Sequence, residues 1–207
     1  MNAPRELQRL DLVEASVVLP GRTLTILRPR SAEALLDEEA FEHEEFLPYW
    51  AELWPAAVAL AREVDARDVR GLHVVELGCG LALPSLVAAL GGAEVLATDW
   101  SPEALGVAAT NADRNGAALQ TALVAWADPE PLLERAPWDL VLAADLLYER
   151  RNVHQLLELL PRLGAEVLLT DPGRPFEAGF LERARESWSV ESRPAALGRV
   201  RIHSLRR

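Results

Sequence analysis

The chain has 207 residues, of which half are apolar and about a quarter charged, and this suits one domain of ordinary size with a buried core. Its formal net charge of -11 argues against a nucleic-acid partner, because phosphate binding needs a basic surface. No apolar run approaches the ~18 residues that a membrane span needs, and the amino terminus lacks a secretory signal. We therefore expect a soluble protein with neither nucleic-acid nor membrane partners.

Cys79 is the only cysteine, so no internal disulfide can form. This suits a reducing compartment, and we expect a cytoplasmic monomer. The four histidines lie far apart in the sequence, with no spacing typical of metal ligands, so no metal site is expected.

The first third of the chain predicts a hairpin and two helices. Two β-rich runs surround Pro20-Gly21 within residues 13–29, which indicates a β-hairpin. Residues 31–46 begin with a Ser and continue as a strongly acidic helical stretch. A second helix is expected from about Glu52, with Pro55 tolerated in its first turn.

From residue 71 onward, short apolar runs alternate with amphipathic helical stretches. The runs are HVVEL, EVLAT, ALVAW, DLVLAA and EVLLT, and the clearest helical stretches are PEALGVAATNADRN (102–115) and NVHQLLELLPRL (152–163). Runs of this kind are typical of parallel strands buried on both faces. Two further runs in the tail favour an antiparallel pair at one edge. The prediction is an α/β fold with a doubly wound, mostly parallel sheet of seven strands.

The segment VVELGCGLALP (74–84) reads as a strand followed by a glycine loop, the place where such a sheet binds ligands. A dinucleotide fingerprint would require glycine at position 83, where this chain has Leu83. The pattern E-x-G-x-G-x-G fits better: Glu76, Gly78 and Gly80 match, and Ala82 is small enough to keep the turn.

Asp99 ends the next apolar run, nineteen residues after Gly80, where a carboxylate can accept both ribose hydroxyls of an adenosine. This spacing fits a nicotinamide or flavin dinucleotide as well as S-adenosylmethionine. A nicotinamide domain usually opens with this loop, whereas about seventy residues precede it here. A third possibility is a tight turn that binds no nucleotide.

The sequence resembles the seven-β-strand methyltransferases, which have a Rossmann-like fold, and within them the family 16 group of protein-lysine methyltransferases. The motifs that carry the resemblance, over residues 46–192, are PYWAELWPAA (48–57), VVELGCGLALPS, the acid Asp99, VAWAD, AADLLYE (143–149) and TDPGRP (170–175). Two of them, PYWAELWP and TDPGRP, are similar to the branch that methylates lysines of the electron-transfer flavoprotein β subunit. The resemblance implies a methyltransferase domain over residues 48–207, with the hairpin and acidic helix of residues 1–47 packed on its core in one domain overall.

The resemblance also implies S-adenosylmethionine as cofactor and gives roles to ten residues. Asp145 and Tyr148, from the pattern D-x-x-Y, would face the acceptor as catalytic residues. The implied cofactor-binding residues are Trp54 at the methionine portion, Gly78, Cys79 and Gly80 beneath the cofactor with Glu76 in the same loop, Asp99 at the ribose, Trp126 by the adenine, and Ala144 through its backbone.

Each of these roles has a plainer alternative. Trp50 and Trp54 lie four residues apart and can share one apolar helix face. Asp145 can cap the helix that starts near Glu149, and Tyr148 and Trp126 can be ordinary packed aromatics. Asp171 can belong to a simple turn between strand and helix. Cys79 has no base beside it in the sequence and is expected to be a small filler rather than a nucleophile.

The favoured function is methylation of a protein lysine, with the electron-transfer flavoprotein β subunit or a similar protein as partner. Asp145 would orient the incoming amine, and the acidic stretch 37–45 would either attract a lysine-bearing surface or form a solvated helix face. The alternatives are N-methylation of a small molecule such as a nicotinamide-like amine, a nicotinamide or flavin oxidoreductase, and a cofactor-binding module without turnover.

Overall fold

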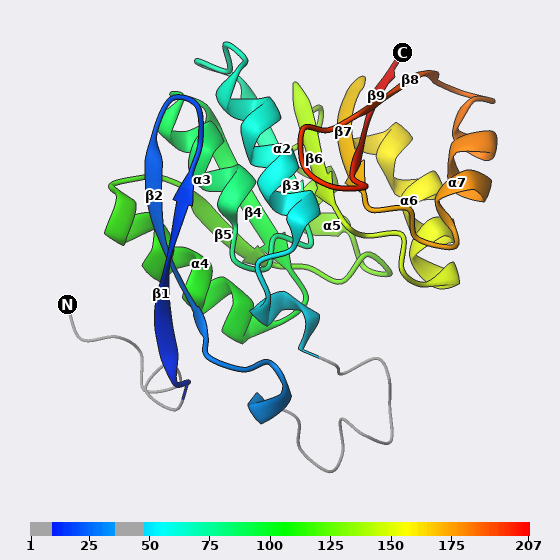
Figure 1. Cartoon of the computed structure of the whole chain (residues 1–207). Coiled ribbons are helices and arrows are strands. Elements are labelled where there is room, and N and C mark those ends of the chain that lie inside the picture. Colours follow the sequence, from blue (N-terminus) through cyan, green and yellow to red (C-terminus); the bar gives the residue numbers. More distant parts are fainter. Residues whose placement is uncertain (1–9, 36–47) are drawn as a thin grey trace.

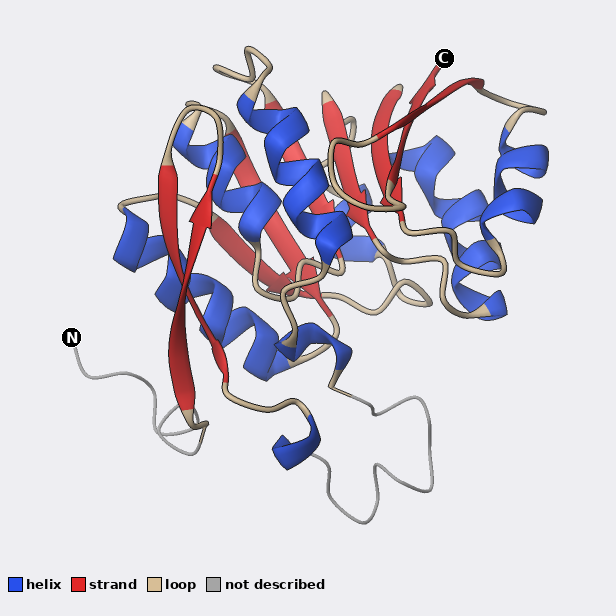
Figure 2. Ribbon diagram, in the orientation of Figure 1, coloured by secondary structure: helices blue, strands red, loops and turns tan. Residues whose placement is uncertain are grey.

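A computed structural model describes residues 10–35 and 48–207, and its centre is a seven-stranded sheet with helices on both faces (Figures 1 and 2). The strands of this sheet are β3 (His73–Leu77), β4 (Glu94–Asp99), β5 (Gln120–Leu123), β6 (Leu140–Ala144), β7 (Glu166–Asp171), β8 (Ser189–Pro194) and β9 (Arg201–Arg206). The helices are α2 (Pro55–Asp65), α3 (Leu83–Leu90), α4 (Pro102–Asn115), α5 (Glu130–Leu133), α6 (Arg150–Leu163) and α7 (Glu177–Ala184).

The strand order is β5-β4-β3-β6-β7-β9-β8, and β3 to β7 run parallel, whereas β9 is antiparallel to both β7 and β8. The predicted doubly wound sheet and its antiparallel edge pair are therefore confirmed. Strands β4 and β5 lie on one side of β3, and β6 and the later strands lie on the other side, so the strand order reverses between β3 and β6. Ligands bind at such a reversal, outside the carboxyl ends of the strands.

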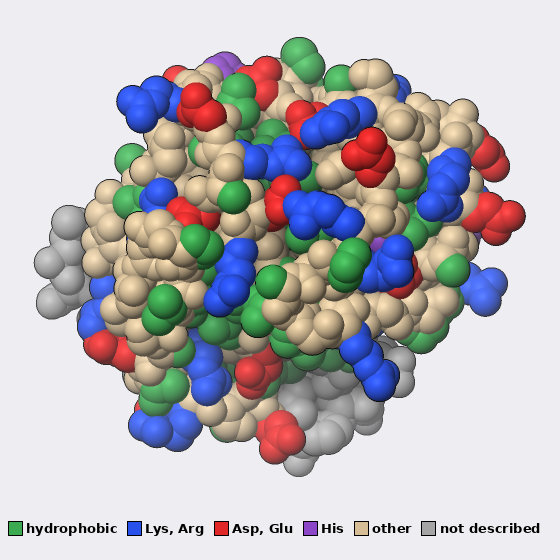
Figure 3. Space-filling model, turned by 45° about the horizontal axis from the view of Figure 1, so that its top comes forward, with side chains coloured by type: hydrophobic (Ala, Val, Ile, Leu, Met, Phe, Trp, Pro, Cys, Tyr) green, Lys and Arg blue, Asp and Glu red, His purple; other side chains and the backbone are tan. Residues whose placement is uncertain are grey.

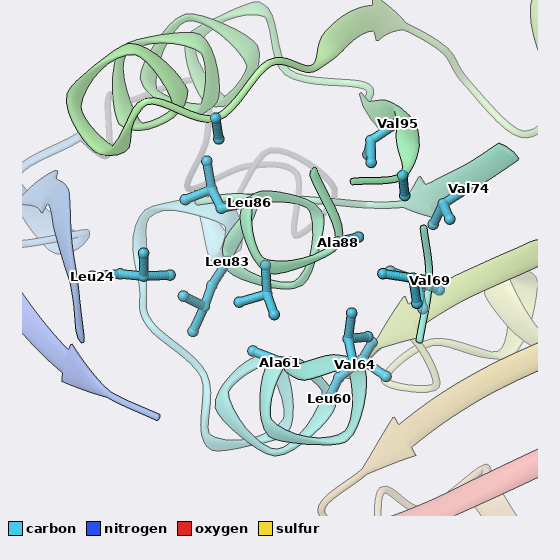
Figure 4. Packing of buried hydrophobic residues seen from close by; sticks show 14 of the residues in the cluster. Leu24, Leu60, Ala61, Val64, Val69, Val74, Leu83, Leu86, Ala88 and Val95 are labelled. Atoms are coloured by element: carbon cyan, nitrogen blue, oxygen red, sulfur yellow. The ribbon is translucent and has the colours of Figure 1, made fainter. Parts of the chain in front are cut away.

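The core lies on both faces of the sheet, because side chains along each strand point to alternate faces. Val74 of β3 packs with α2 and α3, whereas its neighbour Val75 packs with the leucines of α6. Successive side chains of a strand point to opposite faces, so an uninterrupted apolar run serves both layers. Figure 4 shows the first layer, in which side chains from α2 and α3 meet those of the strands.

Helix α6 shows why the opposite layer is helical. Leu156, Leu159, Leu160 and Leu163 recur at the spacing of one helix face, and all four are buried. Full burial of one such side chain contributes about 1.5–3 kcal/mol, so this face alone fixes α6 on the sheet.

The predicted hairpin is present as β1 (Leu12–Val18) and β2 (Thr23–Pro29), which pair antiparallel beside α3 and α4 (Figure 1). The fully buried Asn111 of α4 accepts the backbone N–H of Leu27 at 2.7 Å and donates to the carbonyls of Leu27 and Leu81. One asparagine thus joins the hairpin to the glycine loop. Of the predicted acidic helix only a 3-10 turn, Glu33–Leu35, is described, and the rest lies outside the described residues.

The expected start of the second helix is wrong by three residues. Tyr49–Ala51 forms a 3-10 turn, and α2 begins at Pro55 with Trp54 extended before it at ψ 140°. A residue that precedes proline is driven out of the helical region by the proline ring, so the helix cannot extend back to Glu52. Trp50 and Trp54 therefore do not share a helix face, and that alternative is also wrong.

The third strand of the sheet is likewise displaced from its expected position. The apolar run ALVAW suggested a strand ending at Trp126, but β5 covers Gln120–Leu123 and Val124 to Ala127 line a cavity. As an edge strand, β5 pairs only with β4 and needs no long apolar run.

Within residues 10–35 and 48–207, no helix is long and apolar enough to cross a membrane. On the face shown in Figure 3, arginine and acidic side chains are interspersed. Charged side chains also form pairs between elements: Arg67, just after α2, donates to Glu166 of β7 at 2.9 Å.

Candidate active site

A cavity of about 530 Å³ lies at the carboxyl ends of the central strands, a volume within the range of small-molecule sites. The loops after β3, β4, β5 and β6 line it, together with the segment that leads into α2, which lies at the same end of the sheet in Figure 1. The structure brings all ten candidate residues to this one cavity: Trp54, Glu76, Gly78, Cys79, Gly80, Asp99, Trp126, Ala144, Asp145 and Tyr148.

The glycine loop owes its shape to three left-handed residues. Gly78, Gly80 and Ala82 have φ angles of 58°, 49° and 60°. A Cβ atom on Gly78 would lie 2.8 Å from Cδ2 of Leu146, so this position also lacks room for a side chain. Ala82 keeps the turn, as expected, and directly precedes α3, although a left-handed alanine costs roughly 1–2 kcal/mol.

Asp99 is tied to this loop from the end of β4. Its Oδ2 accepts the N–H of Gly80 at 2.9 Å and its Oδ1 accepts the N–H of Ser101 at 3.0 Å. Burial, with 4% of the residue exposed, raises the pKa of Asp99 above its ordinary value. Backbone N–H groups thus hold the carboxylate in the wall of the cavity, where it can accept hydrogen bonds from a ligand.

Glu76 and Cys79 are buried groups of the same loop. Oε2 of Glu76 accepts the N–H of Ser85 at 2.9 Å and also its hydroxyl, which fastens β3 to the first turn of α3. Burial raises the pKa of Glu76 to about 8, so near neutral pH the side chain is mostly protonated. Burial likewise raises the pKa of the Cys79 thiol well above its usual range, and this suits a filler rather than a nucleophile.

Aromatic side chains line the side of the cavity next to α2. The indole N–H of Trp54 donates to the carbonyl of Tyr49 at 2.7 Å, and the Tyr49 ring lies 5.2 Å from that of Tyr148. Burial is the main reason why the pKa of Tyr148 is raised, so its phenol stays neutral and can donate a hydrogen bond. Trp126 approaches the loop from the opposite side, near Gly78.

Asp145 follows β6 with a left-handed backbone, at φ 58°, and does not cap α6. Both of its carboxylate oxygens are engaged by Arg174, with Nε–Oδ1 and Nη2–Oδ2 distances of 2.7 and 3.1 Å. Only 4% of the Asp145 side chain is exposed, against 32% for Arg174. An incoming group therefore meets the guanidinium before it meets the carboxylate.

Arg174 is a residue of the site that was not predicted from the sequence, although the motif TDPGRP contains it. Asp171 does form the suspected turn, since its Oδ1 accepts the N–H groups of Gly173 and Arg174 at 2.8 and 2.6 Å. This turn also sends Arg174 into the cavity, where its guanidinium carbon lies 5.4 Å from the Trp54 ring centroid. An arginine directly after an acidic turn at the end of a strand was the available signal.

In the part of the chain that the structure describes, no group of three or more His, Cys, Asp or Glu side chains is arranged to hold a metal ion. The chemistry of the described cavity thus depends on a glycine loop, carboxyl groups, aromatics and arginine–carboxylate pairs.

Comparison with known proteins gives concordant matches. A family model described as "Lysine methyltransferase" matches residues 43–170. The electron transfer flavoprotein beta subunit lysine methyltransferase of Xenopus laevis is 35% identical over 134 residues, which cover 61% of this chain and 53% of that protein. The protein N-lysine methyltransferase METTL21A of Danio rerio is 34% identical over 152 residues, covering 68% and 69%. The chain therefore spans between about half and about two thirds of these two relatives.

Among solved structures, the 16S rRNA N2 G1207 methyltransferase RsmC of T. thermophilus, in complex with AdoMet and guanosine, has a TM-score of 0.69 at 17% identity, over 95% of this chain and 50% of that one. At this identity the likeness concerns the fold, and it agrees with the mostly parallel sheet described above.

Proposed function

This chain belongs to the lysine methyltransferase family, and we propose that it is an enzyme that transfers the methyl group of S-adenosylmethionine to a lysine side chain of a protein. One observation carries the proposal: a single cavity holds both the glycine loop with its acid, Asp99, and the pattern Asp145-x-x-Tyr148. We also propose that residues 48–207 form the methyltransferase domain.

The residues present fit this cofactor. A cavity of about 530 Å³ has room for a nucleoside with a short amino-acid tail. Asp99 would accept hydrogen bonds from the ribose hydroxyls, and the loop backbone lines the cavity at Gly78 and Gly80. Trp126 would lie by the adenine and Trp54 by the methionine portion, while Cys79, Glu76 and Ala144 complete the wall between them.

On the acceptor side we propose Asp145 and Tyr148 as the residues that orient the amine. Tyr148 offers a neutral phenol and an aromatic face, and a cation near such a face gains ~0.5–2 kcal/mol. Asp145 would contribute its charge together with Arg174 rather than as a bare carboxylate, because both of its oxygens already accept bonds from that arginine.

The bound cofactor supplies a methyl group that is activated by a positively charged sulfur. The lysine ammonium would first lose a proton to water. The lone pair of its nitrogen would then form the new C–N bond, and the C–S bond would break with its electron pair remaining on sulfur. The chain's contribution is to align the two reactants, which is worth up to about 7–11 kcal/mol.

For the acceptor, we propose the electron-transfer flavoprotein β subunit or a similar protein. The similarity to the Xenopus laevis enzyme of that name supports this choice. The expectations of a cytoplasmic location, a monomeric state and no nucleic-acid or membrane partner stay predictions.

The experiment that tests this function incubates the purified protein and methyl-labelled S-adenosylmethionine with one acceptor at a time: purified electron-transfer flavoprotein β subunit, a different lysine-containing protein, or a nicotinamide-like amine. Mass spectrometry then locates the label. We expect label on a lysine of the flavoprotein subunit. Because this chain contains no lysine, any methyl-lysine must come from the acceptor. Label on another added protein would contradict the choice of acceptor alone, and label on a small amine with no protein labelled would contradict protein methylation.

A further inference from the structure

Arg174 is held at three points at the mouth of the cavity. Its guanidinium donates to both oxygens of Asp145, it lies against the ring of Trp54, and its backbone N–H donates to the fully buried Asp171. A surface ion pair between long flexible side chains contributes little, but a bidentate pair on a nearly buried carboxylate has a fixed geometry. The charge of Arg174 is thus a permanent feature of the acceptor side.

This charge matters because methyl transfer needs a neutral amine. A free lysine has a pKa of about 10.4 and arrives as an ammonium ion. A bare carboxylate beside the amine would favour that charged form, and each unit by which the pKa rises lowers the reactive fraction tenfold. The pair of Asp145 and Arg174 has no net charge, so it holds the amine without stabilising its proton.

The other charged groups of the cavity do not depend on Arg174 in the same way. Glu149 pairs with Arg151 at 2.6 Å, Asp99 accepts backbone N–H groups of its own loop, and Glu52 lies 3.8 Å from Arg28.

Further titratable groups complete this electrostatic environment. Glu76 is mostly protonated near neutral pH, Tyr148 carries a neutral phenol, and the Tyr49 ring lies 5.2 Å from the Tyr148 ring. Asp171 lies behind Arg174, with its Oδ1 bound to backbone N–H groups. Removal of the guanidinium would therefore leave Asp145 and Asp171 as two carboxylates with no cation between them.

We propose that Arg174 is a positioning residue that keeps Asp145 in a neutral ion pair, so that the acceptor lysine reacts as a free amine near neutral pH. The inference rests on the proposed lysine methylation. Arg174 would then determine the pH range over which the enzyme works, and would also orient Asp145.

The test is the pH dependence of the single-turnover rate of methyl transfer, measured between about pH 7 and about pH 10 with saturating cofactor and acceptor. In Arg174→Gln we expect the half-maximal rate to move upward by about one pH unit, so that the rate falls about tenfold at pH 7 and recovers toward the wild-type rate at pH 10. Arg174→Lys keeps the positive charge and should keep the wild-type profile at a lower plateau.

Arg22→Gln is the matched control, because Arg22 also pairs with a nearly buried carboxylate, Asp65 at 2.7 Å, but on the hairpin turn, away from the cavity. Its pH profile should equal that of the wild type. A loss of rate in Arg174→Gln that is equal at every pH, or a profile in Arg174→Lys displaced as far as in Arg174→Gln, would overturn the inference. If the wild type labels no lysine at any pH, the proposed function itself fails, which is a different result.

Discussion

Asp99 and Gly80, nineteen positions apart, are joined by a hydrogen bond of 2.9 Å from the glycine N–H to the carboxylate. The acid at the end of β4 and the loop after β3 thus form one unit, which lines the cavity. We therefore expect Asp99 both to hold the glycine loop in place and to bind the ligand.

Asp99→Asn should raise the dissociation constant for S-adenosylmethionine by about tenfold to a hundredfold, which corresponds to the ~1.5–3 kcal/mol of hydrogen bonds to a charged group. Isothermal titration calorimetry measures this. Asp65→Asn is the control, because Asp65 also accepts a glycine N–H, that of Gly21 at 2.8 Å, but outside the cavity. Equal losses of affinity in the two variants would show that Asp99 acts through stability alone.

Gly78→Ala should lower both thermal stability and cofactor affinity, because the new Cβ would lie 2.8 Å from Leu146 at a φ of 58°. Gly116→Ala separates the effect of the positive φ from that of the close contact. Gly116 has a φ of 69°, but nothing lies within 4 Å of a Cβ atom added there. Backbone strain of roughly 1–2 kcal/mol is then the cost common to both. Thermal unfolding should show a larger loss for Gly78→Ala, and cofactor binding should change only in that variant.

Asp145→Asn should lower methyl transfer by about 10²-fold or more while the cofactor dissociation constant changes by less than about twofold. The reason is that the carboxamide cannot hold Arg174 as a charged pair, whereas Asp99 and the glycine loop stay intact. Asp11→Asn breaks an exposed pair with Arg30 and should leave the transfer rate unchanged. A loss of cofactor binding in Asp145→Asn would place this residue on the cofactor side.

Glu76→Gln should make the protein more stable than the wild type, by a margin that grows as the pH rises from about 5 to about 8. The folded pKa of Glu76, about 8, lies above the unfolded value, so the stability that this group contributes is complete below the unfolded pKa and is lost as the pH rises through the folded one. A glutamine loses no proton and avoids this cost. Urea unfolding at several pH values measures the margin.

Glu166→Gln is the control for that experiment. Burial alone would raise the pKa of Glu166, but Arg67 and Arg206 hold it below its ordinary value, so its contribution is lost as the pH falls. This variant should therefore show a constant margin between about pH 5 and about pH 8. A pH-independent margin in Glu76→Gln as well would mean that Glu76 is ionised in the folded protein.

The local sequence pattern was sufficient to predict most strands of the central sheet. Helix α4 occupies the residues predicted for it, because Ser101, Pro102 and Gly116 mark its two ends with ordinary capping chemistry. The start of α2 was misplaced since the helical pattern before Pro55 was given more weight than the restriction that a proline places on the residue before it.

The sequence predicted which residues line the site better than it predicted the hydrogen bonds between them. The glycine loop and Asp99 follow from strand order, but cofactor choice and the roles of Asp145 and Tyr148 depended on a family resemblance. The pair of Asp145 with Arg174 joins residues 29 positions apart, and no spacing rule connects the ends of two parallel strands at that distance. Only the fold brings β6 and β7 side by side and turns the arginine onto the acid.

The most direct measurement of the central claim is amino-acid analysis of a lysate of the source cells after incubation with the purified protein and methyl-labelled S-adenosylmethionine. The account predicts that the label is recovered as methylated lysine from protein, and that Asp145→Asn abolishes it. Label recovered only as methylated arginine, or only in the small-molecule fraction, would contradict the assignment of this cavity to lysine methylation.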